Sequence, residues 1–101
     1  MSSGSKSQTK GKRYIYFYLN RIGVEKIIDV VPKHIQYWQT AAMNDYIGGP
    51  FSDHTGGLIL FRASNLEEAI NITLGDSFLT ENLITQRWIK EWDTEKSITS
   101  V

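Results

Sequence analysis

The pattern of hydrophobic and polar positions changes its period along the 101-residue chain, and each period predicts a different element. Residues 14–19 alternate strictly, with tyrosines at every second position and Ile15, Phe17 and Leu19 between them. A period of two is typical of a β-strand, here one with large side chains on both faces. Three more segments have the pattern of strands, namely residues 46–51, 57–63 and 85–92.

Two other segments repeat apolar residues at helical spacing. The first is predicted to begin near Pro32, which suits the opening turn of a helix, and to run to about Asp45. His34 is then expected in that first turn, at the border of the apolar stripe, where outward-pointing backbone N–H groups would disfavour a charged ring. The second helix covers residues 66–74 and ends at Gly75, because glycine commonly follows the last turn.

The order of predicted elements is βαββαβ, which indicates an α+β, ferredoxin-like fold with two helices on one face of a four-stranded antiparallel sheet. Residues 76–84 are predicted to connect the second helix to the last strand without regular structure. The folded domain is expected over residues 13–93, between a flexible tail of residues 1–12 and a short tail of residues 94–101.

Two helices can cover only one side of such a sheet, yet both sides carry large side chains. We expect the tyrosines of the first strand to share the uncovered face with Trp88 and Trp92. A solvated face would be mainly polar, so this aromatic face predicts contact with a partner or a ligand. We expect a homodimer formed sheet on sheet, with a small-molecule pocket where the faces part. The alternative is that aromatic residues are present only because they favour strands.

Composition narrows the range of functions. The chain has no cysteine, which excludes disulfides and thiolate chemistry. Residues 1–13 hold four basic residues and no acidic one, so the rest of the chain carries 7 basic and 11 acidic residues. This acidic body does not favour nucleic acid as a partner. No apolar run reaches the length of a membrane span, and we expect a cytoplasmic protein without membrane contact.

Two histidines are candidates for proton chemistry. Histidine is the side chain that titrates nearest neutral pH, and His34 alone lies on a predicted helix or strand. A histidine bonded only to backbone, with no catalytic role, is the alternative. His54 follows Asp53 in a polar loop, where a solvated turn residue is the simpler interpretation. The two histidines lack the spacing of metal ligands, so we predict neither a metal nor another cofactor.

The segment "IGGPFSDHTGG", residues 47–57, places two glycine pairs and a proline in or beside the predicted strands. Gly49 and Pro50 should weaken strand pairing and let the backbone bend or bulge. We interpret the segment as the wall of a ligand pocket, with Ser52 as a hydrogen-bonding group. A wide hairpin without a binding role is the alternative. The segment lacks both the lysine of a phosphate-binding loop and the serine elbow of a hydrolase.

Five short sequences, "VVPKHIQYW", "YIGGPF", "GGLILFRA", "NLEEAI" and "GDSF", together resemble the YCII-related (YciI-like) domain family over about residues 13–93. The resemblance implies a ferredoxin-like fold that dimerises into an α+β barrel, with a site built around a histidine and an aspartate. Some members of the family are linked to dehydrohalogenase-like elimination on aromatic compounds. Carried over to this chain, the site residues are His34 and Asp76, with Gly49, Pro50 and Phe78 around the substrate.

One departure from the family concerns the residue after Asp76. The family has proline there, whereas this chain has Ser77, so the connection is expected to be less rigid. The position of Asp76 is then less firmly set, and Asp45 and Asp53 stay open as alternative partners of His34.

Two functions from different classes follow. The first is an enzyme without a cofactor, a lyase or isomerase acting on a small cyclic or aromatic molecule. His34 would move the proton, Asp76 would orient its ring, and the aromatic face that includes Tyr16 would enclose the substrate. The second is a non-catalytic dimeric module that binds a small ligand or a protein. Asp76 within hydrogen-bond reach of His34 inside a concavity would favour the enzyme.

Overall fold

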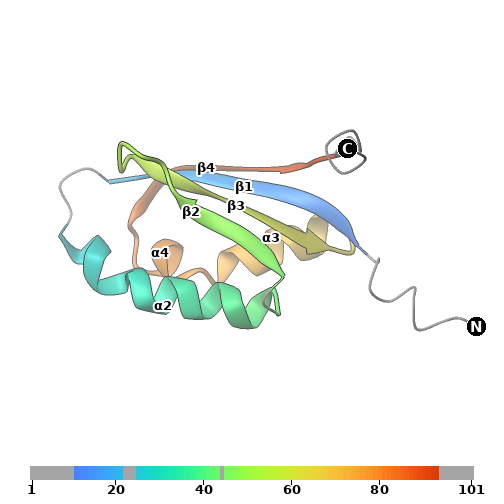
Figure 1. Cartoon of the computed structure of the whole chain (residues 1–101), viewed down its shortest axis with the longest axis horizontal. Coiled ribbons are helices and arrows are strands. Elements are labelled where there is room, and N and C mark those ends of the chain that lie inside the picture. The colour runs from blue at the N-terminus through green and yellow to red at the C-terminus, as the bar shows by residue number, and fades with distance from the viewer. Residues whose placement is uncertain (1–10, 22–24, 44, 94–101) are drawn as a thin grey trace, which may run out of the picture.

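Four antiparallel strands form one sheet in the order β2-β3-β1-β4, and the helices lie on one side of it (Figure 1). The structure is a computed structural model that describes residues 11–21, 25–43 and 45–93. Its elements are β1 (Lys12–Asn20), α2 (Lys26–Ala41), β2 (Tyr46–Pro50), β3 (Gly56–Ala63), α3 (Leu66–Leu74), α4 (Ser77–Thr80) and β4 (Ile84–Glu91). The predicted ferredoxin-like α+β fold is confirmed. A short helix, α4, is added where the sequence predicted an irregular connection.

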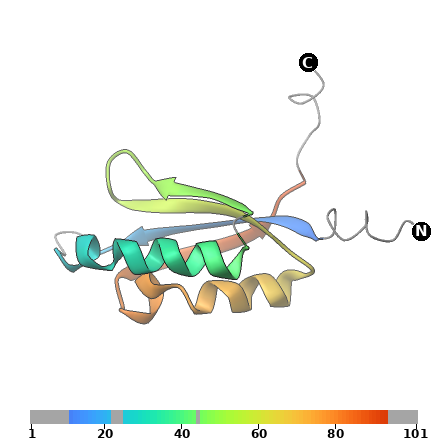
Figure 2. The same cartoon turned by 60° about the horizontal axis from the view of Figure 1, so that its bottom comes forward.

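The tyrosines of β1 face the helices, so their predicted position on the uncovered face is wrong. Tyr14, Tyr16 and Tyr18 are at most 4 % exposed, and the ring of Tyr16 stacks on Trp38 of α2 at 6.0 Å. Figure 2 shows α2 and α3 running along this face of the sheet. The strand register places the alternate residues on the free face: Ile15, Phe17, Leu19, Ile47, Leu58, Leu60 and Trp88.

Register also gives the physical reason for this orientation. Tyr18 lies opposite Gly57 of β3, whereas Phe17 lies opposite Leu58. Both rows contain a glycine of β3, but a Cβ atom at Gly57 would lie 2.6 Å from the Tyr18 hydroxyl, so this glycine leaves room for a phenol ring on the covered face. Packing density in a core requires such large-to-small matching, so the tyrosine row becomes the buried one.

Helix α2 begins at Lys26, well before Pro32, so the prediction that Pro32 occupies its first turn is wrong. A proline inside a helix removes one backbone hydrogen bond. The helix nevertheless continues through it, because Val30 before it and Trp38 after it are both buried in the core. His34 therefore lies inside the helix, and the end effect expected of a first-turn position does not apply.

The domain boundaries predicted from the sequence can be compared with the structure only in part. Residues 1–10 and 94–101 lie outside the described residues. Lys12, which was predicted to belong to the tail, is the first residue of β1 and pairs with Ala63. Within the described ranges, no helix is long and apolar enough to cross a membrane. The cytoplasmic location stays a prediction.

Candidate active site

Helices α2 and α4 meet at a histidine–aspartate pair. His34 Nδ1 lies 2.7 Å from Asp76 Oδ1, which is the distance of a strong hydrogen bond. The Asp76 side chain is fully buried, and the His34 side chain is 13 % exposed. The two residues that the family resemblance singles out are thus in direct contact.

Asp76 is held in place by the start of α4. It is the N-cap of that helix, and its Oδ1 accepts a hydrogen bond from the backbone N–H of Phe78 at 2.9 Å. Ser77 occupies the first helical position, where the family has proline. The cap bond fixes the carboxylate without the proline, since it depends on the Asp76 side chain and the backbone alone. The departure at Ser77 therefore leaves Asp76 in position.

The two alternative aspartates lie elsewhere. Asp45 forms an ion pair with Arg62 at 3.3 Å. Asp53 accepts hydrogen bonds from the hydroxyl and the backbone N–H of Thr55, at 2.7 and 3.1 Å, within the β2–β3 turn. These two bonds lower the pKa of Asp53 from its ordinary value. Neither carboxylate is hydrogen-bonded to His34, so Asp76 is the partner that the fold supplies.

The contact with Asp76 determines which nitrogen of His34 is available for chemistry. A carboxylate can only accept a hydrogen bond, so we assign the proton of the neutral ring to Nδ1. Nε2 is then a free base. Phe78 stacks on the ring with centroids 4.0 Å apart and an angle of 10°, and Tyr18 packs edge-on at 6.2 Å. The ring is therefore held in one orientation, as a proton-transfer group requires.

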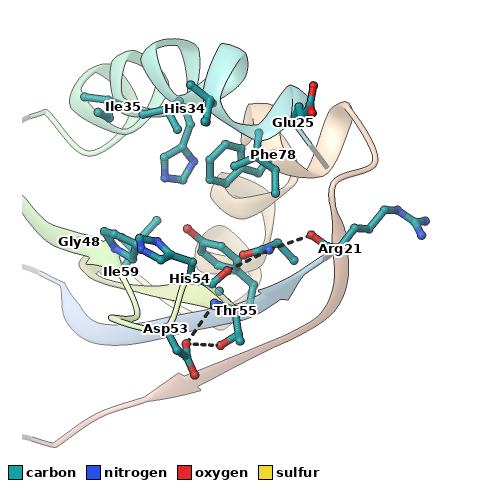
Figure 3. Close-up of a pocket in the computed structure, with 18 of the residues that line it drawn as sticks. Arg21, Glu25, His34, Ile35, Gly48, Asp53, His54, Thr55, Ile59 and Phe78 are labelled. Atoms are coloured by element: carbon teal, nitrogen blue, oxygen red, sulfur yellow. Dashed lines mark hydrogen bonds between the residues drawn. The ribbon is translucent and has the colours of Figure 1, made fainter. Parts of the chain in front are cut away.

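His34 stands on the wall of a cavity of about 930 Å³ between α2 and the β2–β3 hairpin (Figure 3). This volume is typical of pockets that hold small ligands. Helix α2 gives the cavity an apolar wall, formed by Ile27, Ile28, Val31 and Ile35. No group of three His, Asp or Glu side chains within the described part of the chain is arranged to hold a metal.

The predicted substrate-binding residues divide into two sets. Gly49, Pro50 and Phe78 line the cavity. Ser52 is exposed in the hairpin turn and Tyr16 is fully buried in the core, and neither belongs to the cavity wall. The side chain of Tyr16 cannot reach the cavity because it points between the sheet and Trp38.

Several polar residues on the cavity wall were not assigned to a site from the sequence, among them Tyr18, Asn20, Arg21 and His54. His54 adopts a left-handed backbone conformation with φ of 64°. Its carbonyl accepts a hydrogen bond of 3.4 Å from Asn20 Nδ2. Histidine is among the few residues that tolerate this conformation. The polar loop around His54 was a visible signal, but a sequence pattern does not say toward which side a loop residue points.

The glycines of residues 47–57 serve different purposes. A Cβ atom at Gly57 would lie 2.6 Å from the Tyr18 hydroxyl, and one at Gly56 would overlap the Tyr18 backbone carbonyl. The second glycine pair thus lets β1 and its Tyr18 side chain approach β3 closely. The bend expected at Gly49 and Pro50 is absent, because β2 pairs with β3 in regular register through Pro50. Pro50 is the last residue of an edge strand, where a missing N–H interrupts no ladder.

A compact α+β domain with a buried histidine–aspartate pair beside a cavity is the class of protein that this geometry defines. The YCII-related domain family matches residues 12–93, and the chain belongs to that family. Among solved structures, it is similar to 5-chloro-2-hydroxyhydroquinone dehydrochlorinase (TftG) from Burkholderia phenoliruptrix AC1100, in complex with 2,5-dihydroxybenzoquinone. The TM-score is 0.74 and the identity 20 %, over 84 % of this chain and 97 % of that chain. Similarity at this identity establishes the fold alone. No curated protein sequence matches the chain.

Proposed function

We propose that the protein is an acid–base catalyst, working without a cofactor, that acts on a small cyclic or aromatic molecule. The observation that carries this proposal is the 2.7 Å bond between His34 Nδ1 and Asp76 on the wall of the cavity. Nε2 of His34 takes a proton from the substrate. The buried Asp76 carboxylate then stabilises the imidazolium that forms and keeps the ring oriented.

The substrate class is supported by the apolar and aromatic cavity wall. Phe78 and the isoleucines of α2 offer flat or apolar surface to a ring-shaped molecule. The similar fold of a dehydrochlorinase that binds a dihydroxybenzoquinone also favours elimination as the reaction. In that reaction His34 accepts the proton, the electrons of the broken bond form a double bond, and the leaving group departs as an anion from the neighbouring carbon.

We also propose a homodimer that forms through the free face of the sheet. Leu58 and Trp88 on this face are 37 % and 41 % exposed. Phe17 stacks on Trp88 with centroids 4.9 Å apart. Lys90 and Gln86 of β4 share this face. The large apolar and aromatic side chains beside them are typical of an interface and are rare on a solvated sheet.

A non-catalytic ligand-binding module is the second candidate. The observation that favours it is the exposure of Ile28 and Ile35, 76 % and 43 %, at the cavity. Apolar side chains at a cavity mouth can hold a ligand without any proton transfer.

One experiment separates the two candidates. The protein is screened by thermal shift against substituted phenols, hydroquinones and quinones, and halogenated members that bind are assayed for halide release. His34→Gln keeps an N–H that can reach Asp76 but has no base, so turnover should fall about 10²- to 10⁴-fold while binding changes little. Asp45→Asn, which removes a carboxylate that lies outside the cavity wall and pairs with Arg62, is the control and should retain turnover. Full turnover in His34→Gln contradicts the proposal, and binding without turnover in the wild type supports the second candidate.

A further inference from the structure

Tyr18 brings a phenol hydroxyl to the cavity beside His34. Its ring lies edge-on to His34 at 6.2 Å and to Phe78 at 6.0 Å. The side chain is 4 % exposed, and it belongs to the cavity wall. The hydroxyl extends as far as Gly57 of the hairpin, in space that only a glycine leaves open. Gly57 therefore leaves the space that the Tyr18 hydroxyl occupies.

Three other polar side chains on the wall already donate hydrogen bonds within the protein. Arg21 Nε donates to the backbone carbonyl of Asn82 at 2.9 Å, and Asn20 Nδ2 donates to the carbonyl of Arg21 at 3.0 Å. The hydroxyl of Thr55 donates to Asp53. The Tyr18 hydroxyl, by contrast, has no hydrogen-bond partner among the described residues. Because the ring of Tyr18 packs edge-on against that of His34, a ligand held at His34 could accept a hydrogen bond from this hydroxyl.

The Tyr18 hydroxyl also keeps its proton. Burial, and then the negative charge of Asp76, raise the pKa of Tyr18 above its ordinary value. A phenol in this environment donates a hydrogen bond and does not ionise at neutral pH.

We propose that Tyr18 donates a hydrogen bond to a substrate oxygen that is negatively charged in the transition state, and that the substrate is therefore a phenol or a cyclic ketone. This inference rests on the proposed function of His34. When Nε2 of His34 removes a proton from the carbon beside the carbonyl of the ketone, or of the keto tautomer of the phenol, the C–H electrons form a C=C bond and the carbonyl electrons move to oxygen, giving an enolate. Return of those electrons restores the carbonyl and expels the leaving group with its bonding pair. Tyr18 stabilises the oxyanion throughout and keeps its own proton.

The test uses 4-nitrophenol, whose absorbance distinguishes the phenolate from the neutral phenol. Binding is measured for the full chain as wild type, Tyr18→Phe and Tyr16→Phe. Tyr16 is the matched control, because its phenol is buried in the same row and does not reach the cavity. Wild type and Tyr16→Phe should bind the phenolate with similar Kd, and Tyr18→Phe should bind it about 10-fold more weakly.

Each outcome bears on one of the two proposals. Equal phenolate affinity in Tyr18→Phe and wild type overturns the proposed role of Tyr18. The proposed function of His34 is then still tested by the turnover of His34→Gln. A wild type that turns over a substrate but does not bind the phenolate overturns the substrate class. A wild type that binds the phenolate but turns over nothing overturns the catalytic proposal alone. If Tyr18→Phe does not fold, the wild type still decides, because a bound probe that is neutral contradicts the inference.

Discussion

Both faces of the sheet carry large apolar and aromatic side chains, but only one face is covered by helices, and β1 shows the difference within one strand. Tyr16 is fully buried beneath Trp38 of α2. Its neighbour Phe17 points to the other face, where it is only partly buried and stacks on Trp88. Helices of the same chain therefore cover this face of the sheet. The free face carries Lys90 and Gln86 beside its apolar side chains and is covered by no element that the structure describes.

The covered face also differs in its chemistry, because it holds the buried carboxylate of Asp76. Asp76 lies close enough to the buried tyrosines that its charge, after burial itself, raises the pKa of Tyr16 and of Tyr18. These phenols stay protonated around a single carboxylate that contacts His34. The covered face thus holds both the core and the candidate site. Because the proposed catalytic site and the proposed dimer interface lie on opposite faces, substitutions should separate the two proposals.

The largest expected effect is a loss of unfolding free energy, and it is compared for one phenylalanine on each face of the sheet. Phe61 is 1 % exposed and packs against Trp38 at 5.1 Å, so Phe61→Ala should lower the free energy of unfolding by about 3–5 kcal/mol. Phe17→Ala leaves a gap on a partly exposed surface and should lower it by about 1 kcal/mol in the monomer. Urea unfolding of dilute protein measures both values. Equal losses would remove the distinction between the two faces.

The next effect concerns association through the free face. Light scattering at micromolar concentration should give about twice the chain mass of 11.5 kDa for the wild type. Leu58→Glu places a charge in the proposed interface and should give monomer or aggregate. Gln36→Glu, which adds the same charge on the exposed side of α2, is the control and should stay dimeric. A monomeric wild type with a well-ordered free face would contradict the dimer.

Hydrophobic periodicity was sufficient to predict the fold, because it reports which residues share a face of a strand or helix. It could not rank two equally large rows, and so the tyrosines of β1 were assigned to the wrong face. The Tyr18 hydroxyl occupies space that Gly57 leaves open, and that pairing depends on the register between two strands. The start of α2 was missed for a similar reason. Pro32 is a strong local signal for a first turn, and burial of Val30 before it outweighs that signal.

The candidate site was predictable only where a motif carried it. His34 and Asp76 came from the family resemblance, and the cap of α4 that holds Asp76 was not expected because residues 76–84 have no clear period. Tyr18 and His54 depend on features that spacing does not encode: the orientation of a strand in one case, and a left-handed backbone in a loop in the other.

The smallest expected effect concerns Glu81, which links α4 to α2 on the covered side. Its carboxylate lies 2.9 Å from Lys26 Nζ and 3.3 Å from Lys33 Nζ. The hydrogen bond from Lys26, followed by that from Lys33, lowers the pKa of Glu81 from its ordinary value. A carboxyl whose pKa is depressed by folding contributes stability above the ordinary pKa of glutamate, and this contribution is lost as the pH falls through the lowered pKa.

Glu81→Gln should therefore lower the melting temperature at pH 7 by about 2 °C or less, because both lysines are exposed and water screens the pairs. The difference should shrink in high salt and vanish once the pH is below the lowered pKa of Glu81. Lys33→Gln and the double variant complete a mutant cycle, which should show that the two substitutions are not additive. The His34–Asp76 bond does not involve Glu81, so ligand binding should not change. A melting-temperature difference that persists in acid would mean that Glu81 acts through packing and not through its charge.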